Sequence, residues 1–197
     1  MREALRFLEI QGVLTMKSGP GGGPVVSSPD PRHLASMLTL ILQMSGAPYR
    51  TVLEARQLLE PTLARQAAER ISEADLDLLR ACLERSAADT ESDDAFLSEN
   101  RTFHALIAKA SENQILEYLL SALRWITEQT AVGAEYSNRR RGTILDEHRR
   151  VVEALADRDP DGAEQAMRAH MQDVVAYLER RHSQVMSTPL RWDRVAP

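Results

Sequence analysis

The feature that most constrains this chain is the helical spacing of its apolar residues, which runs from about residue 32 almost to the C-terminus. Apolar side chains recur three and four positions apart, and this spacing places them on one face of an α-helix. Helices are expected over residues 32–44, 51–70, 72–88, 93–110, 114–130, 143–158 and 160–182, with a loop over 131–142. Pro61 lies inside one segment and is expected to kink or break that helix. The pattern predicts an all-α fold, an antiparallel helical bundle of about six to seven helices.

The first thirty residues follow a different pattern. Residues 2–9 have helical spacing, and Gly12 is expected to cap that helix. Residues 13–17 and 25–26 are typical of two short strands joined by the glycine-rich segment 18–24. Residues 27–31 contain two prolines and predict a linker. The expected units are therefore residues 1–26, the linker 27–31, a helical domain over 32–187 and a C-terminal tail over 188–197.

Composition excludes several classes of protein. The chain has 197 residues, a formal charge of −5 and a single cysteine, Cys82, so no internal disulfide can form. No apolar run approaches the about 18 residues of a membrane span, and the N-terminus lacks the apolar core of a signal peptide. We expect a soluble cytoplasmic protein with no membrane contact. An acidic chain does not coat nucleic acid non-specifically, so any contact with DNA requires a local basic patch.

Three of the five histidines fall on the apolar faces of three different expected helices. His104, His148 and His170 each stand where the helical period predicts burial, and Asn100 lies one turn before His104. One divalent metal satisfies three buried imidazoles at once and keeps coordination positions open for water or a ligand. The alternative is that each histidine is an ordinary core residue bonded to a backbone carbonyl. The spacing leaves both interpretations open.

Several segments together resemble a known family of bacterial proteins. They are LEARQLLEPTLARQAAER (53–70), NRTFHALIAKASEN (100–113), DEHRRVVEAL (146–155) and DPDGAEQAMRAHM (159–171). In order and separation they are similar to the FCD effector domain of GntR-type transcription regulators of the FadR subfamily. The segment MREALRFLEIQGVLTMKSGPGGGPVV is similar to the recognition helix and wing of that family's winged helix-turn-helix, so a partial winged helix is expected before the bundle.

The resemblance implies a metal site. The family's ligands are three histidines and an acidic residue one turn before the first of them, and these positions correspond here to His104, His148, His170 and Asn100. This chain has Asn where Asp is common, which leaves the site more positive by one charge. The implied cofactor is a divalent metal ion, with zinc as the first choice and nickel or another metal as alternatives.

The resemblance also implies an effector, and Arg56 is the residue expected to bind it. The family's effectors are often small organic acids, and Arg56 corresponds to an arginine that can face the cavity. A guanidinium suits a carboxylate through a bidentate pair. A structural salt bridge from Arg56 to Glu60, one turn later, is the alternative interpretation.

A further implication is binding to a DNA operator by a homodimer. Residues 1–26 carry a net charge of +1. Arg2 and Arg6 are the expected groove contacts, and Lys17 beside the glycine tip is the expected phosphate contact. The two helices that precede a recognition helix in the family are absent from the sequence, so a truncated or mis-started regulator is expected. If the short form is the native one, a stand-alone sensor without DNA binding is the alternative.

A metal-dependent enzyme is the second candidate function. A three-histidine site with an open position activates water in zinc enzymes, but this chemistry needs a general base. Glu147 adjoins His148 but lies about 100° around the helix, and Glu99 is off-face beside Asn100 in the same way. A third candidate is a metal that only stabilises the bundle. A ligand-responsive transcription regulator is the leading prediction, and catalysis is not expected.

Overall fold

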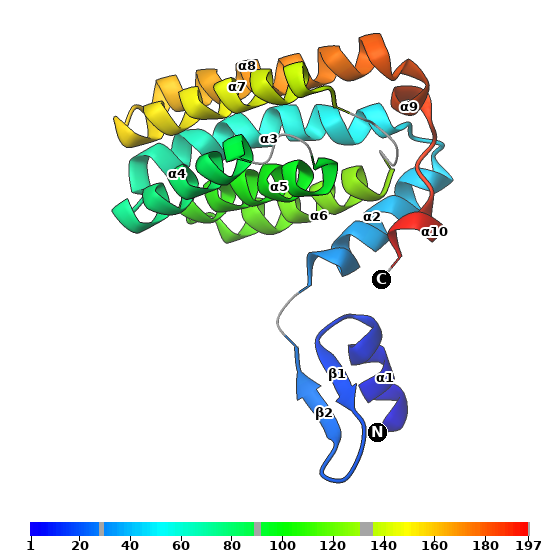
Figure 1. The fold of residues 1–197 in the computed structure, drawn as a ribbon. Helices are drawn as coiled ribbons and strands as arrows, with labels where there is room; N and C mark the ends of the chain where they lie inside the picture. Colours follow the sequence, from blue (N-terminus) through cyan, green and yellow to red (C-terminus); the bar gives the residue numbers. More distant parts are fainter. Residues whose placement is uncertain (28–29, 89–91, 131–135, 197) are drawn as a thin grey trace.

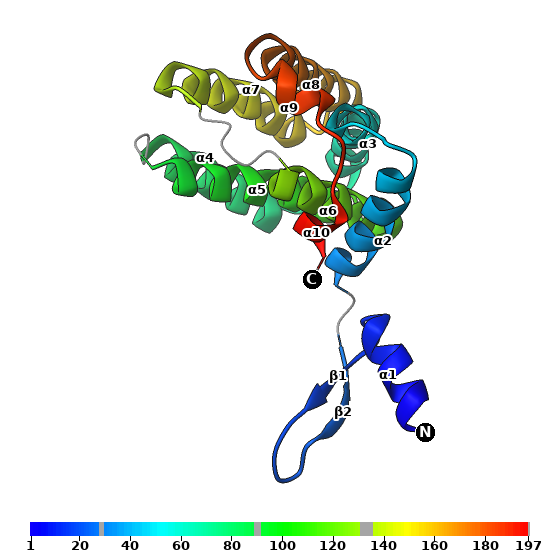
Figure 2. The same ribbon diagram turned by 90° about the vertical axis from the view of Figure 1, so that its right-hand side faces the viewer.

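The computed structural model describes residues 1–27, 30–88, 92–130 and 136–196, and it has two parts (Figure 1). A small N-terminal unit, here called the head, lies below a larger set of helices, here called the bundle (Figures 1 and 2). The head consists of α1 (Arg2–Ile10), β1 (Leu14–Lys17) and β2 (Gly23–Val26). The bundle consists of α2 (Pro31–Met44), α3 (Tyr49–Arg70), α4 (Glu73–Ala88), α5 (Asp93–Ala110), α6 (Gln114–Thr130), α7 (Asn138–Ala156), α8 (Pro160–Arg181), α9 (Ser183–Ser187) and α10 (Trp192–Val195).

Helix α3 is the centre of the bundle. It packs most extensively against α8 and also contacts α5, α6 and α7. Helices α7 and α8 form one layer, while α4, α5 and α6 form the opposite layer (Figures 1 and 2). One core cluster lies around Phe103 and Leu155, and a second lies around Leu53 and Ile126. These apolar faces confirm the all-α bundle that the helical spacing predicts.

Short polar side chains fix where several helices begin. Asp30, Ser92, Ser137 and Asp159 each accept a hydrogen bond from a backbone N–H in the first turn of the helix that follows. This cap satisfies a donor that has no partner within the helix. Proline follows Asp30 and Asp159 directly, and its fixed φ suits the first helical position. The expected starts of α2 and α8 are therefore explained by their caps.

The structure corrects the expected loop over 131–142 and decides part of the expectation at Pro61. The expected loop over 131–142 is too long, because residues 138–142 already belong to α7; residues 131–135 lie outside the described part of the chain. Ser137 caps the first turn of this helix, and Arg140 in that turn packs over the ring of Tyr177. These two contacts stabilise a polar first turn that has no apolar stripe to reveal it in the sequence. At Pro61 the sequence predicts either a kink or a break, and the break does not occur, because α3 continues through this buried proline although its ring nitrogen donates no hydrogen bond.

The segment expected to be a tail packs on the bundle. Leu190 and Val195 are fully buried, and α10 contacts α2 and α6. The indole Nε1 of Trp192 donates a hydrogen bond to Ser36 Oγ at 2.7 Å, and that of Trp125 donates to the carbonyl of Val195 at 3.1 Å. The end of the chain therefore closes the part of the core around Leu53 and Ile126.

The head has very little core of its own. Helix α1 has no buried residue, and Leu14 is the buried hydrophobic residue of this unit. Gly12 ends α1 with φ of +71°, as expected for a glycine cap, and the N–H of Val13 donates to the carbonyl of Leu8. The hairpin is antiparallel, with Leu14 opposite Val26. Within the described residues, no helix is both long and apolar enough to cross a lipid bilayer.

Candidate metal centre and effector cavity

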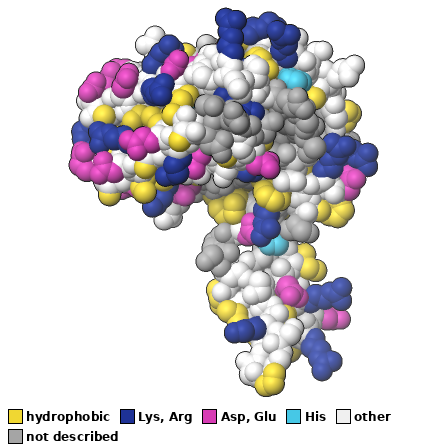
Figure 3. Space-filling view, in the orientation of Figure 1, with side chains coloured by type: hydrophobic (Ala, Val, Ile, Leu, Met, Phe, Trp, Pro, Cys, Tyr) yellow, Lys and Arg dark blue, Asp and Glu magenta, His cyan; other side chains and the backbone are white. Residues whose placement is uncertain are grey.

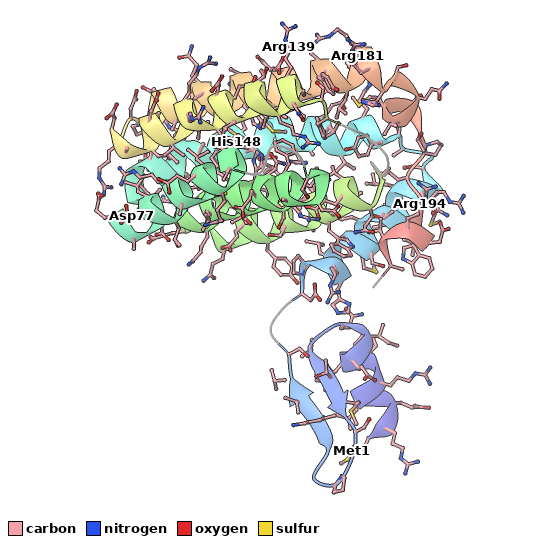
Figure 4. All side chains as sticks on the ribbon, viewed as in Figure 1. Met1, Asp77, Arg139, His148, Arg181 and Arg194 are labelled. Atoms are coloured by element: carbon pink, nitrogen blue, oxygen red, sulfur yellow. The ribbon has the colours of Figure 1, made fainter. Side chains whose placement is uncertain are left out.

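Three buried imidazoles from three helices meet inside the bundle. His104 comes from α5, His148 from α7 and His170 from α8, and each is at most 3% exposed. One ring nitrogen from each lies within 4.8 Å of the others. His148 Nε2 and His170 Nε2 are 3.4 Å apart. Figure 4 shows His148 in the interior, between the layers of helices. The structure therefore brings together the three histidines that the sequence selects.

Two carboxylates stand behind two of these rings. His170 Nδ1 lies 2.8 Å from Glu147 Oε2, and His104 Nδ1 lies 2.5 Å from Glu60 Oε2. Neither Glu60 Oε2 nor His104 Nδ1 has another polar partner among the described residues. Contact at Nδ1 leaves Nε2 of each ring directed to the centre, and carboxylates in this position orient metal-binding histidines.

The sequence predicts the direction of Glu147 on its own helix but not the residue that it contacts. It lies off the face of His148, as the helical geometry requires, but it contacts the histidine of the neighbouring helix α8. Glu60, which sequence reasoning considered only as a partner of Arg56, contacts His104 as well. Both carboxylates are engaged with the outer nitrogens of the rings, so neither is placed as a free general base.

Burial sets the protonation of two of the rings. Desolvation lowers the pKa of His104 to about 4, against the opposing effect of Glu60. Burial and the two neighbouring imidazoles hold the pKa of His148 well below its usual range. Burial opposes ionisation of Glu60, but Arg56 and His104 keep the pKa of this carboxyl well below its usual range. Near neutral pH these two rings are uncharged, the form that binds a metal.

The donor set fits a divalent metal ion. Zinc–nitrogen bonds of about 2.0–2.1 Å in tetrahedral geometry separate two ligand nitrogens by roughly 3.3–3.4 Å. The Nε2 atoms of His148 and His170 have that separation, and His104 offers a third nitrogen. The ring of His148 also stacks on Phe103 with centroids 3.7 Å apart, which fixes its orientation. The three histidines are thus arranged as a group that could hold a metal ion.

A cavity of about 330 Å³ opens beside this group. His104, His170 and Asn100 are in its wall, so the amide of Asn100 borders the same space as two of the three histidines. The wall is completed by Tyr49, Leu53, Arg56, Phe96, Leu97, Arg101, Arg124, Thr127, Glu128, Tyr136, Ile144, Met171, Val174 and Leu178. A small molecule in this cavity would contact the metal centre and several cationic side chains together.

Arg56 satisfies both interpretations that the sequence left open. Its Nε donates to Glu60 Oε1 at 2.7 Å, which is the i, i+4 salt bridge, and its Nη1 donates to Thr127 Oγ1 at 3.1 Å. It also lies in the cavity wall. Burial disfavours the charged form, but Glu60 more than compensates, so the pKa of Arg56 is raised. Arg56 is a fixed cation at the cavity, connected through Glu60 to His104.

Sequence reasoning missed Arg124, a second buried arginine of the cavity wall. It lies on α6 one turn after Leu120, which is fully buried, and one turn before Thr127. The helical period of that apolar stripe therefore indicates an inward position. An arginine is usually assigned to solvent, and for that reason the signal was overlooked.

The three basic residues expected to contact DNA are on the head. Arg2 and Arg6 lie one turn apart on α1, Lys17 ends β1, and all three are exposed. Lys and Arg side chains on the head are visible in Figure 3, together with acidic ones. No described contact joins these residues to the histidine group, so the head and the cavity are separate sites.

Comparison with known proteins places this architecture in a family. Residues 51–173 match the FCD domain. The chain is 30% identical to the HTH-type transcriptional regulator YcbG of Bacillus subtilis over 88% of its length and 71% of that protein. It is 28% identical to the regulator LutR of the same organism, over 88% of this chain and 81% of LutR. A solved structure of a Streptococcus agalactiae GntR protein superposes with a TM-score of 0.63 at 27% identity, covering 88% of this chain and 78% of that one.

The chain belongs to the FCD-domain family of GntR-type transcription regulators. It is therefore a transcription regulator in class, and its family does not consist of enzymes. GntR-type regulators bind DNA operators, so the family membership agrees with the leading sequence prediction.

Proposed function

We propose that this protein is a ligand-responsive regulator in which a metal-containing cavity of the bundle binds a small organic acid. The observation that carries the proposal is the shared wall: His104, His170, Asn100 and Arg56 face one cavity of about 330 Å³. A metal and a guanidinium around one small space favour an anionic ligand, because its charge is matched from both sides. Glu60 contacts both Arg56 and His104, so a ligand at either group affects the other.

The metal ligands in this proposal are His104, His148, His170 and Asn100, and zinc is the proposed ion. The ion would supply Lewis acidity toward a ligand oxygen. Glu147 and Glu60 hold the rings of His170 and His104 from behind, and Phe103 holds His148. Asn100 provides a neutral amide oxygen, so the site keeps one more positive charge than a carboxylate would leave. That charge favours an anionic effector.

DNA binding is proposed for residues 1–26, with Arg2, Arg6 and Lys17 in contact with the operator. A homodimer places two heads on two half-sites, and the spacing of the heads then controls affinity. An effector that favours one spacing shifts the population between the two arrangements. The head and the bundle are in close contact where Gly12 of the head lies against the ring of His33 on α2. An added Cβ on Gly12 would overlap that ring.

A pair of measurements tests the proposal. The full chain is titrated with Zn²⁺ by calorimetry, and the loaded protein is then titrated with a panel of short carboxylates. His148→Ala should weaken zinc binding at least about 100-fold, and His33→Ala, at a histidine outside the cavity, should leave it unchanged. Operator binding is followed by gel shift with DNA from upstream of the regulator's own gene. Absence of zinc binding, or carboxylates that bind without changing DNA affinity, would overturn the proposal.

A further inference from the structure

The second buried arginine of the cavity differs from the first in its partners. Arg56 has its Nε and Nη1 committed to Glu60 and Thr127. Arg124 is only 9% exposed, yet among the described residues its guanidinium makes no hydrogen bond. Its ion-pair partner among the described residues is Glu128, whose Oε1 lies 3.6 Å from Nη2. Charge-assisted N–H···O bonds are about 2.7–2.9 Å long, so this pair is separated by more than a hydrogen bond.

A buried guanidinium without acceptors is costly, and buried polar groups normally have partners. Burial disfavours the charged form of Arg124 and, together with the charge of Arg56, lowers its pKa to about 10. Arg124 faces the cavity, so a ligand inside that cavity is the partner that its position allows. A carboxylate matches the planar fork of the guanidinium through two parallel hydrogen bonds.

The charges around the cavity leave room for more than one anionic group. Among the residues that the structure describes, the wall contains three cations, Arg56, Arg101 and Arg124, and one carboxylate, Glu128. Glu128 is shared between two arginines, at 3.6 Å from Arg124 and 3.7 Å from Arg101. Glu60 behind the wall compensates Arg56. A divalent ion at the histidines adds two further positive charges, so a ligand with a single negative charge leaves the cavity strongly positive.

We propose that the effector is a small dicarboxylate, with one carboxylate at the histidine centre and Arg56 and the other on Arg124. This inference rests on the proposed function, and it names the chemical class of the ligand. Arg124 is then the specificity-determining residue that distinguishes a dicarboxylate from a monocarboxylate. Arg101, about half-exposed at the same wall, adds attraction for the second carboxylate.

The test compares two four-carbon acids that differ by one carboxylate, succinate and butyrate. Each is titrated calorimetrically into the full chain, with and without one equivalent of Zn²⁺. A hydrogen-bonded contact to a charged group contributes about 1.5–3 kcal/mol, so succinate should bind roughly 10- to 100-fold more tightly than butyrate. Arg124→Gln should remove this preference and leave butyrate affinity within about threefold. Arg50→Gln, at an exposed arginine of α3, is the matched control and should preserve the preference.

A second variant keeps the test decisive if Arg124→Gln does not fold, which circular dichroism would reveal. Glu128→Gln removes the anion that competes for Arg124, so it should strengthen succinate binding more than butyrate binding. Equal binding of succinate and butyrate by the unmodified protein overturns the dicarboxylate inference and leaves the proposed carboxylate cavity standing. Failure of both acids to bind overturns both proposals. An unchanged preference in a folded Arg124→Gln protein overturns the role of Arg124.

Discussion

The head and the bundle are built from the same kinds of side chain but bury them very differently. In the bundle, α3 alone has Leu63, Ala64, Ala67 and Ala68 with no exposed surface. In the head, α1 has no buried residue, and Phe7 and Ile10 are 61% and 64% exposed. A helix and a two-stranded hairpin without a shared core are only marginally stable in water. The bundle therefore has a large core of its own, whereas the head has too little core to be stable by itself.

The largest expected contrast between the two parts is in amide hydrogen exchange of the full chain. Amides of α3 should exchange only through global unfolding, with an opening free energy of about 5–15 kcal/mol. Amides of α1 should open at below about 2 kcal/mol, because few apolar contacts hold that helix. Exchange followed by mass spectrometry measures both in one sample. Equal protection of α1 and α3 would contradict the comparison.

A matched pair of phenylalanines gives the next largest effect. Phe103 is fully buried and stacks on His148, so Phe103→Ala should lower the free energy of unfolding by about 3–5 kcal/mol. Phe7→Ala, at an exposed position of the head, should change it by less than about 0.5 kcal/mol. Urea denaturation measures both values. A large loss from Phe7→Ala would show that the head contributes to the stability of the whole chain.

A pair of glycines gives the smallest effect and acts on the joint between the two parts. Gly12 has φ of +71°, and an added Cβ would lie 2.2 Å from the His33 ring, so Gly12→Ala should loosen the head by about 1–2 kcal/mol. Gly142 is helical with open space around it, so Gly142→Ala should stabilise the bundle by about 0.5–1 kcal/mol. Hydrogen exchange of β1 and a thermal melt report the two effects separately. The two substitutions should change stability in opposite directions. If Gly12→Ala also stabilised the protein, the close contact between Gly12 and His33 would be refuted.

The bundle was largely predictable because periodicity is a property of one helix at a time. The apolar stripes located the three histidines on inward faces. The partners of the histidines were not predictable in this way. Glu147 contacts His170 only because α7 and α8 are neighbours, and that neighbourhood depends on the tertiary fold.

Two inward charged residues were within reach of sequence reasoning and were missed. Glu60 precedes Leu63 and Ala64 by one turn, so the stripe of α3 already places it inside. Arg124 follows the buried Leu120 by one turn on α6, so its apolar stripe places it inside in the same way. Both were treated as ordinary charged residues, for which burial is rare. Buried charges persist where they have partners or bind ligands: Arg124 is in the cavity wall, and Glu60 contacts Arg56 of that wall and His104.

A zinc titration shows whether the three buried histidines hold a metal ion at the wall of the ligand cavity. Metal-stripped full-length protein is titrated with Zn²⁺ alongside His148→Ala and the control His33→Ala. We expect one equivalent of zinc to bind to the unmodified protein and to His33→Ala. Because loss of an outer partner of a ligand already costs about 10- to 100-fold, loss of the ligand His148 should weaken binding at least about 100-fold. Equal zinc affinity for all three proteins, or no binding by the unmodified protein, would contradict this expectation.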